Sequence, residues 1–141
     1  MEYNFNRFLT EHDKDYATAL SEVKSAKTTS RWMWYIFPQI NGLGQSETSK
    51  IYAIHNLKEA REYVKHPVLG THLIEISEAL LDLETNDAYS IFGKPYDKKL
   101  HSCMTLFDQV SGNTVFEKVL CKYFDGKFDQ KTLELIAFNE D

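Results

Sequence analysis

The sequence contains no apolar run of about 20 residues, the length that a helix needs to cross a bilayer. Its amino-terminal stretch, MEYNFNRFLTEHDKDY, also lacks the basic and apolar regions of a signal peptide. We therefore expect a cytoplasmic protein with no membrane partner.

Glycine, proline and cysteine are scarce, with six, three and two copies among 141 residues. No linker rich in glycine, proline or serine divides the chain and no internal repeat is present, so we expect a single domain over residues 1–141. Cys103 and Cys121 form neither a CxxC pair nor a zinc-binding spacing, and both fall in apolar helical patterns. We expect both to be reduced thiols in the core.

Positive charge is also in the minority, since 16 Lys and Arg residues face 21 Asp and Glu residues, for a formal net charge of −5. Nonspecific binding to duplex nucleic acid depends on clustered Lys and Arg and is therefore disfavoured, although an isolated basic pocket is compatible with this charge. No HExxH motif or cysteine cluster is present. His66 and His72 would point about 240° apart around a helix, so we expect no metal and no cofactor.

Helical periodicity dominates the rest of the sequence, of which 43% is hydrophobic. Apolar residues recur at spacings of three and four, as on the buried face of a helix. Asn56 and Asn113 are expected N-caps, and Gly93 is expected to end a helix in the left-handed conformation. The expected helices cover 15–26, 31–37, 57–65, 67–83, 87–92, 95–112 and 113–126, with a last one from Asp129. The sequence thus predicts an all-α, compact bundle of about seven or eight short helices.

The least ordinary segment is RWMWYIFPQINGLGQS, residues 31–46, which holds both tryptophans. Spacings of three and four would place Arg31, Trp34 and Tyr35 on one side of a short helix. An arginine beside an aromatic face can bind an anion next to a ring. A core tryptophan with an arginine stem packed along it would give the same pattern.

A polar loop follows this helix, formed by Gln39, Gly42, Gly44, Gln45 and Ser46. Backbone amides of such a loop and the N-terminus of the next helix can bind an anion. A tight turn in which Ser46 is the N-cap explains the same residues.

The helix after Pro95 carries a row of polar residues on one face: Asp97, His101, Thr105 and Asp108. Carboxylate, imidazole and hydroxyl groups in a row suit general acid–base catalysis, and a solvated helix face explains them equally well. Lys99 and Ser102 lie three apart on another side. No nucleophile stands at a spacing that brings it to a base, so no reaction is indicated and enzymatic activity is left open.

Four motifs together resemble a bacterial family, the domain of unknown function 1810. They are SRWMWYIFPQINGLGQS, HPVLGTHL, FGKPYDKKLHSCMTLF and CKYFDGKFDQKTLELI, and the resemblance extends from about Phe5 to Ile136. It implies a mostly helical single domain without an established activity. Members have been labelled calpastatin-like, but inhibitor segments that fold on binding are low in hydrophobic residues, whereas this chain has a core. The sequence departs from the family pattern at Tyr96, where an acidic residue is expected, and at His101, where arginine is common.

These patterns lead to one hypothesis and one alternative. The hypothesis is a pocket that binds a small anionic or nucleotide-like ligand between the aromatic segment and the helix after Pro95. The alternative is a protein-interaction module or homodimer that uses the aromatic segment as its interface. A purely structural role of the segment is a third reading. The candidate ligand-binding residues are Arg31, Trp32, Trp34, Gln39, Ser46, His66, Asp97, Lys99 and Ser102.

Overall fold

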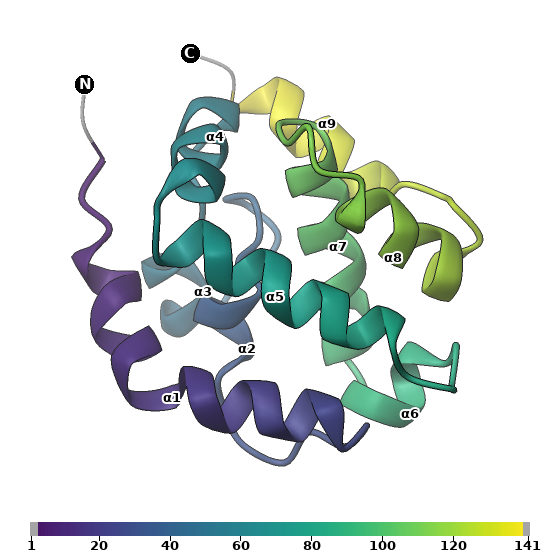
Figure 1. Ribbon diagram of the computed structural model, residues 1–141. Coiled ribbons are helices and arrows are strands. Elements are labelled where there is room, and N and C mark those ends of the chain that lie inside the picture. Colours follow the sequence, from purple (N-terminus) through teal and green to yellow (C-terminus); the bar gives the residue numbers. More distant parts are fainter. Residues whose placement is uncertain (1–2, 140–141) are drawn as a thin grey trace.

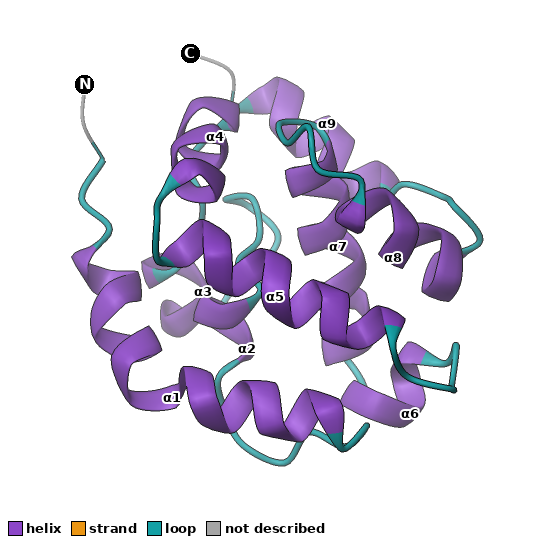
Figure 2. Ribbon diagram, in the orientation of Figure 1, coloured by secondary structure: helices purple, strands orange, loops and turns teal. Residues whose placement is uncertain are grey.

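The computed structural model describes residues 3–139, which form nine helices joined by loops, with no strand in that range (Figure 2). The prediction of an all-α fold is confirmed. The helices are α1 (Asn6–Lys24), α2 (Met33–Ile36), α3 (Glu47–Ile51), α4 (Leu57–Lys65), α5 (Leu69–Leu81), α6 (Ala88–Phe92), α7 (Tyr96–Asp108), α8 (Val115–Phe124) and α9 (Gln130–Phe138).

Helices α5 and α7 organise the core. Figure 1 shows α5 crossing the middle of the molecule, where it packs against α1, α4 and α8. Helix α7 packs against α4, α6, α8 and α9. Both helices bury continuous apolar faces, which include Leu73, Ile76, Leu80, Cys103 and Phe107, each with no exposed surface. In the described range, no helix is both long enough and apolar enough to span a membrane.

The predicted helix starts are largely confirmed. Most can be recognised from the sequence, because side chains near the start of each helix cap its first N–H groups. The Asn56 side chain accepts a hydrogen bond from the Glu59 N–H, so α4 begins where the sequence predicts. The Ser46 hydroxyl caps α3 and the Asp129 carboxylate caps α9 in the same way. Asn113 also accepts from the first N–H of α8, at Val115, although the residue in the cap position is Thr114.

Several expectations about local structure are wrong. The described chain has nine helices, close to the expected number of about seven or eight, but α1 begins at Asn6, well before the expected start at Asp15. Gly93 has a positive φ of 75°, but its ψ of 177° is extended, outside the left-handed helical region. Cys103 is buried as expected, whereas Cys121 is exposed, because it lies on the outer side of α8. Both thiols are free.

A close backbone contact joins α4 to α5. A Cβ atom on Gly70 would lie 2.0 Å from the carbonyl oxygen of Val64, far inside van der Waals contact. Only glycine therefore fits at this position of α5, which explains the glycine in the motif HPVLGTHL.

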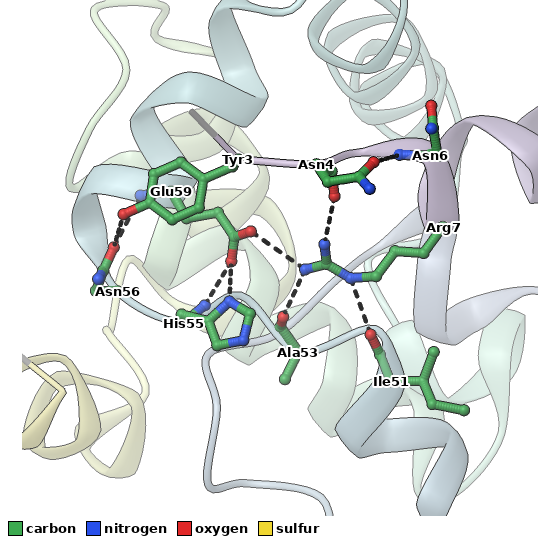
Figure 3. Close-up of polar contacts among 9 residues, drawn as sticks. All are labelled: Tyr3, Asn4, Asn6, Arg7, Ile51, Ala53, His55, Asn56 and Glu59. Carbon is green, nitrogen blue, oxygen red and sulfur yellow. Dashed lines mark hydrogen bonds and ion pairs between the residues drawn. The ribbon is translucent and has the colours of Figure 1, made fainter. Parts of the chain in front are cut away.

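A buried ion pair ties the start of α1 to the start of α4 (Figure 3). The Glu59 side chain is 1% exposed, and its Oε2 lies 3.2 Å from Nη2 of Arg7. Its Oε1 accepts hydrogen bonds from the backbone N–H of His55 at 2.7 Å and from the His55 ring Nδ1 at 2.8 Å. Arg7 also donates to the carbonyl oxygens of Ile51 at 2.9 Å and Ala53 at 3.1 Å. One carboxylate and one guanidinium thus hold α1, the 51–55 loop and α4 together.

Candidate functional site

The candidate site with the most geometric support lies where the loop after α2 meets α7. A parallel β-bridge between Ile40 and Ile54 fixes this loop: the Ile54 N–H donates to the Gln39 carbonyl, and the Asn41 N–H donates to the Ile54 carbonyl, both at 2.8 Å. The bridge holds the backbone on either side of Ile40, so that the Gln39 side chain can reach α7. Its Nε2 donates to Oγ of Ser102 at 2.7 Å.

Lys99 completes this polar cluster. Its Nζ donates to Oε1 of Gln39 at 3.3 Å and lies 5.9 Å from the centre of the Trp34 ring. Ser102 in turn donates from Oγ to the carbonyl oxygen of Lys99 at 3.0 Å. The Lys99 side chain is half-buried, and burial lowers the pKa of its ammonium group from the ordinary value. No carboxylate lies within ion-pair distance of Lys99 in the part of the chain that the structure describes.

A pocket of about 440 Å³ opens beside this cluster. Its lining joins the loop after α2, α7 and the beginning of α9, and consists of Gln39, Leu43, Pro95, Lys98, Lys99, His101, Ser102, Asp129 and Lys131. Three of these residues are lysines and one is an aspartate. The Asp129 carboxylate accepts hydrogen bonds from the Thr132 N–H and hydroxyl, as the N-cap of α9. The carboxylate is thus engaged by its own helix, and the lysines give the pocket positive charge.

His101 forms part of the pocket wall, and its contacts define its neutral tautomer. Its ring stacks on Phe124 with centroids 4.2 Å apart, and its Nε2 lies 2.8 Å from the carbonyl oxygen of Lys127. A carbonyl only accepts, so Nε2 carries the hydrogen, and the neutral ring keeps its lone pair on Nδ1.

The structure brings four of the predicted site residues together: Trp34, Gln39, Lys99 and Ser102. Asp97 is close by in the chain, in the first turn of α7, but does not line the pocket. Its Oδ1 is buried and has no hydrogen-bond partner among the described residues.

The other four predicted site residues lie elsewhere. Arg31 is exposed on the loop before α2, and Ser46 serves as the N-cap of α3. His66 accepts from the backbone N–H groups of Val68 and Leu69 through Nδ1, which connects α4 to α5. Trp32 is 1% exposed in the core.

Trp32 binds a carboxylate that anchors the loop before α2. Its Nε1–H donates to Glu22 at 3.0 Å, and the same carboxylate accepts from the N–H groups of Thr29 and Ser30 and from the Ser30 hydroxyl. Burial raises the pKa of the Glu22 carboxyl, but these hydrogen bonds outweigh burial and lower it to about 2. Trp32 is therefore a structural residue.

Two predicted helix faces do not exist as expected. Trp34 and Tyr35 point to different neighbours, because Trp34 packs edge-on against Tyr96 while the Tyr35 hydroxyl donates to Asp15 on α1. The row on α7 is not a solvated face either. Thr105 is fully buried and accepts a hydrogen bond from the backbone N–H of Asp129 at 2.9 Å, which attaches the start of α9.

A histidine pair that no sequence pattern indicated lies between α1 and α5, with His12 buried and His72 half-buried. His12 is 3% exposed, and its Nε2 lies 2.8 Å from the carbonyl oxygen of Tyr35, so Nε2 carries the hydrogen. Its Nδ1 therefore accepts from Nδ1 of His72, 2.9 Å away. The Tyr16 ring stacks on His72 with centroids 3.6 Å apart, and its hydroxyl donates to Glu75.

Because His12 is buried in its neutral form, we expect the free energy of unfolding to fall in mild acid. Burial lowers the pKa of His12 to about 4 from 6.5, because desolvation disfavours the charged ring, and the nearby His72 acts in the same direction. The unfolded chain takes up this proton below pH 6.5 and the folded chain only near pH 4, so the free energy of unfolding should fall by about 3 kcal/mol over this window. Denaturant titrations across the window measure this loss.

The matched variant is His12→Gln, whose amide can donate to the Tyr35 carbonyl and accept from His72 without titrating. We expect its pH dependence to be less than half that of the parent. An equally steep slope in the variant would assign the effect to other groups, including His72, whose pKa burial also lowers.

Fold and site define a small all-helical protein with a lysine-lined pocket between a loop and a helix. The chain matches the family described as "Protein of unknown function (DUF1810)" over residues 2–136 and belongs to this family. A similar solved structure is that of the conserved hypothetical protein Rv1873 from Mycobacterium tuberculosis. It shares 35% sequence identity over 94% of this chain and 96% of that chain, with a TM-score of 0.91. No curated protein is significantly similar to the chain.

Proposed function

We propose that this protein binds a small anionic, nucleotide-like ligand in the lysine pocket, defined as the cavity lined by Lys98, Lys99 and Lys131 together with Gln39 and Ser102. The observation that supports this function is three ammonium groups around one cavity whose single carboxylate is engaged by its own helix. The volume of about 440 Å³ falls in the range of small-molecule sites.

The lining residues supply complementary interactions. Lys98 on α7 and Lys131 on α9 are exposed, so both can pair with a phosphate or carboxylate in the pocket. The Lys99 ammonium has three hydrogens and uses one for Gln39, so two can serve the ligand. Leu43 and Pro95 add apolar surface on which a ring can lie. The overall charge of −5 makes this local positive field distinctive.

The alternative of an interface built on the aromatic segment has less support. Within α2 and its preceding residue, Trp32, Met33, Tyr35 and Ile36 are buried and only Trp34 is half-buried. Such a segment offers a partner little apolar surface. We therefore favour ligand binding over a homodimer through this segment.

Isothermal titration calorimetry tests the proposal with inorganic phosphate, AMP and uncharged adenosine. We expect the two anions to bind and adenosine to bind more weakly. A ligand at one hundred times its Kd should add about 2.7 kcal/mol to the stability, which raises Tm by several degrees. Tryptophan emission should change as well, since Trp34 lies beside Lys99.

The matched variants separate the pocket from general charge. Lys98→Gln with Lys131→Gln should weaken anion binding by about one-hundredfold or more, because the pair removes two charge-assisted hydrogen bonds of about 1.5–3 kcal/mol each. Lys118→Gln removes an exposed charge from α8, outside the pocket, and should leave binding unchanged. No heat and no Tm shift with any anion, on folded protein, would rule the function out.

A further inference from the structure

Lys99 differs from the other partly buried cations of this protein in how little compensates its charge. Arg7 pairs with the buried Glu59, and the Lys122 ammonium donates to the carbonyl oxygens of Leu81 and Leu83. Lys99 has one neutral acceptor, the Gln39 amide oxygen at 3.3 Å, and an aromatic ring at 5.9 Å. Its nitrogen is thus partly desolvated, and among the described residues no carboxylate lies within ion-pair distance of it.

These surroundings favour a nucleophilic amine. A lysine attacks a carbonyl only in its neutral form, and desolvation in an apolar or cationic pocket is the usual way in which proteins populate that form. Burial lowers the pKa of Lys99 in this direction. Gln39 accepts from the amine without adding negative charge, and the Gln39–Ser102 hydrogen bond holds the amide in place.

We propose that Lys99 forms an imine with a small anionic carbonyl compound whose charged group is held by Lys98 and Lys131. The proposal rests on the proposed function, because the same pocket must first bind the anion. The three lysines then have separate roles: the two exposed ones bind the carboxylate or phosphate, and the half-buried one reacts.

The step needs no oxidant or metal. The lone pair of Nζ attacks the carbonyl carbon, the C–N bond forms, and the carbonyl oxygen takes a proton from water as the nitrogen loses one, which gives a carbinolamine. The carbinolamine then loses its hydroxyl group and the remaining N–H proton as one water, which leaves a C=N bond. Water in the open pocket accepts the proton that the nitrogen releases.

Reductive trapping tests the proposal, with pyridoxal 5′-phosphate as an anionic aldehyde probe. The full-length protein is incubated with a limiting amount of the probe, reduced with sodium borohydride and digested, and labelled lysines are located by mass spectrometry. We expect label on Lys99 in preference to Lys118, protection by inorganic phosphate, and weaker labelling by pyridoxal, which lacks the phosphate.

Variants identify the reacting nitrogen. Lys99→Arg keeps the charge but lacks the amine and should lose the label, whereas Lys118→Arg, on α8 outside the pocket, should leave the label on Lys99 unchanged. If the arginine does not fit, Lys99→Met keeps the shape of the stem, and a melting curve verifies that either variant folds.

The possible outcomes distinguish imine formation at Lys99 from anion binding in the same pocket. Uniform labelling of surface lysines overturns the imine, and if calorimetry still detects phosphate, anion binding stands without it. Selective labelling of Lys99 that phosphate does not prevent overturns the proposal as stated, because the carbonyl compound would then react without the anion site.

Discussion

Replacing Glu59 with glutamine should lower the free energy of unfolding by about 3–5 kcal/mol, the usual cost of breaking a buried ion pair from one side. The side chain is 1% exposed and binds Arg7 and His55 through its two oxygens. Glutamine has nearly the same shape but presents an NH₂ group to one of these donors and leaves the Arg7 guanidinium without its counter-charge. For a chain of this size, Tm should fall by roughly 10 °C or more.

The effect should exceed that of an ordinary charge removal on the same helix. Glu62 also lies on α4 but is exposed, so Glu62→Gln should change stability by less than about 0.5 kcal/mol. Urea denaturation of both variants gives the comparison. Similar midpoints for the two variants would mean that Arg7 and Glu59 contribute no more than a surface pair.

The ion pair also illustrates what the sequence could and could not predict. The pattern Asn56-x-x-Glu59 belongs to a helix start, and the sequence correctly predicted the cap at Asn56. Nothing local indicates that Arg7, 52 residues earlier, lies against Glu59. Caps and apolar spacings are short-range signals, and for this reason α4, α5 and α9 were predicted close to their true starts.

Errors in the predicted fold arose where tertiary packing decided the outcome. The first turns of α1 contain several polar residues and no strong periodicity, yet Phe8 and His12 there are buried against other helices. Cys121 follows an apolar pattern but lies one position beyond the buried pair Val119 and Leu120, so α8 turns it outward. A single helix can indicate its apolar stripe but not the edges of that stripe.

The sequence could predict only part of the candidate site, because the rest depends on tertiary packing. Lys99 and Ser102 are three apart on one helix, so their proximity is a local property. Gln39 reaches them only because the Ile40–Ile54 bridge fixes its loop, and Lys131 reaches the pocket only because α9 docks on α7. The lysines in the segments KPYDKK and GKFDQK were the available signal for a basic pocket, but their meeting is a feature of the fold.

The aromatic segment provides the second large effect. Trp32→Ala should cost about 3–5 kcal/mol, because it removes a fully buried ring from the core and one of the hydrogen-bond donors to Glu22. Trp34→Ala should cost clearly less, since this ring is half-buried and its neighbours are Tyr96 and Lys99. Thermal and denaturant unfolding of the two variants measure the difference.

The two tryptophans therefore divide one motif into a fully buried part, at Trp32, and a half-buried part beside Lys99, at Trp34. Trp32→Phe keeps most of the buried area but lacks the N–H group, so it should recover most of the stability lost in the alanine variant. Trp34→Ala should still fold and should lose the emission change that an anion causes, because Trp34 is the tryptophan beside Lys99. Equal destabilisation by both alanine variants, with the emission change intact in folded Trp34→Ala, would place the whole segment in the core and leave the lysine pocket without an aromatic neighbour.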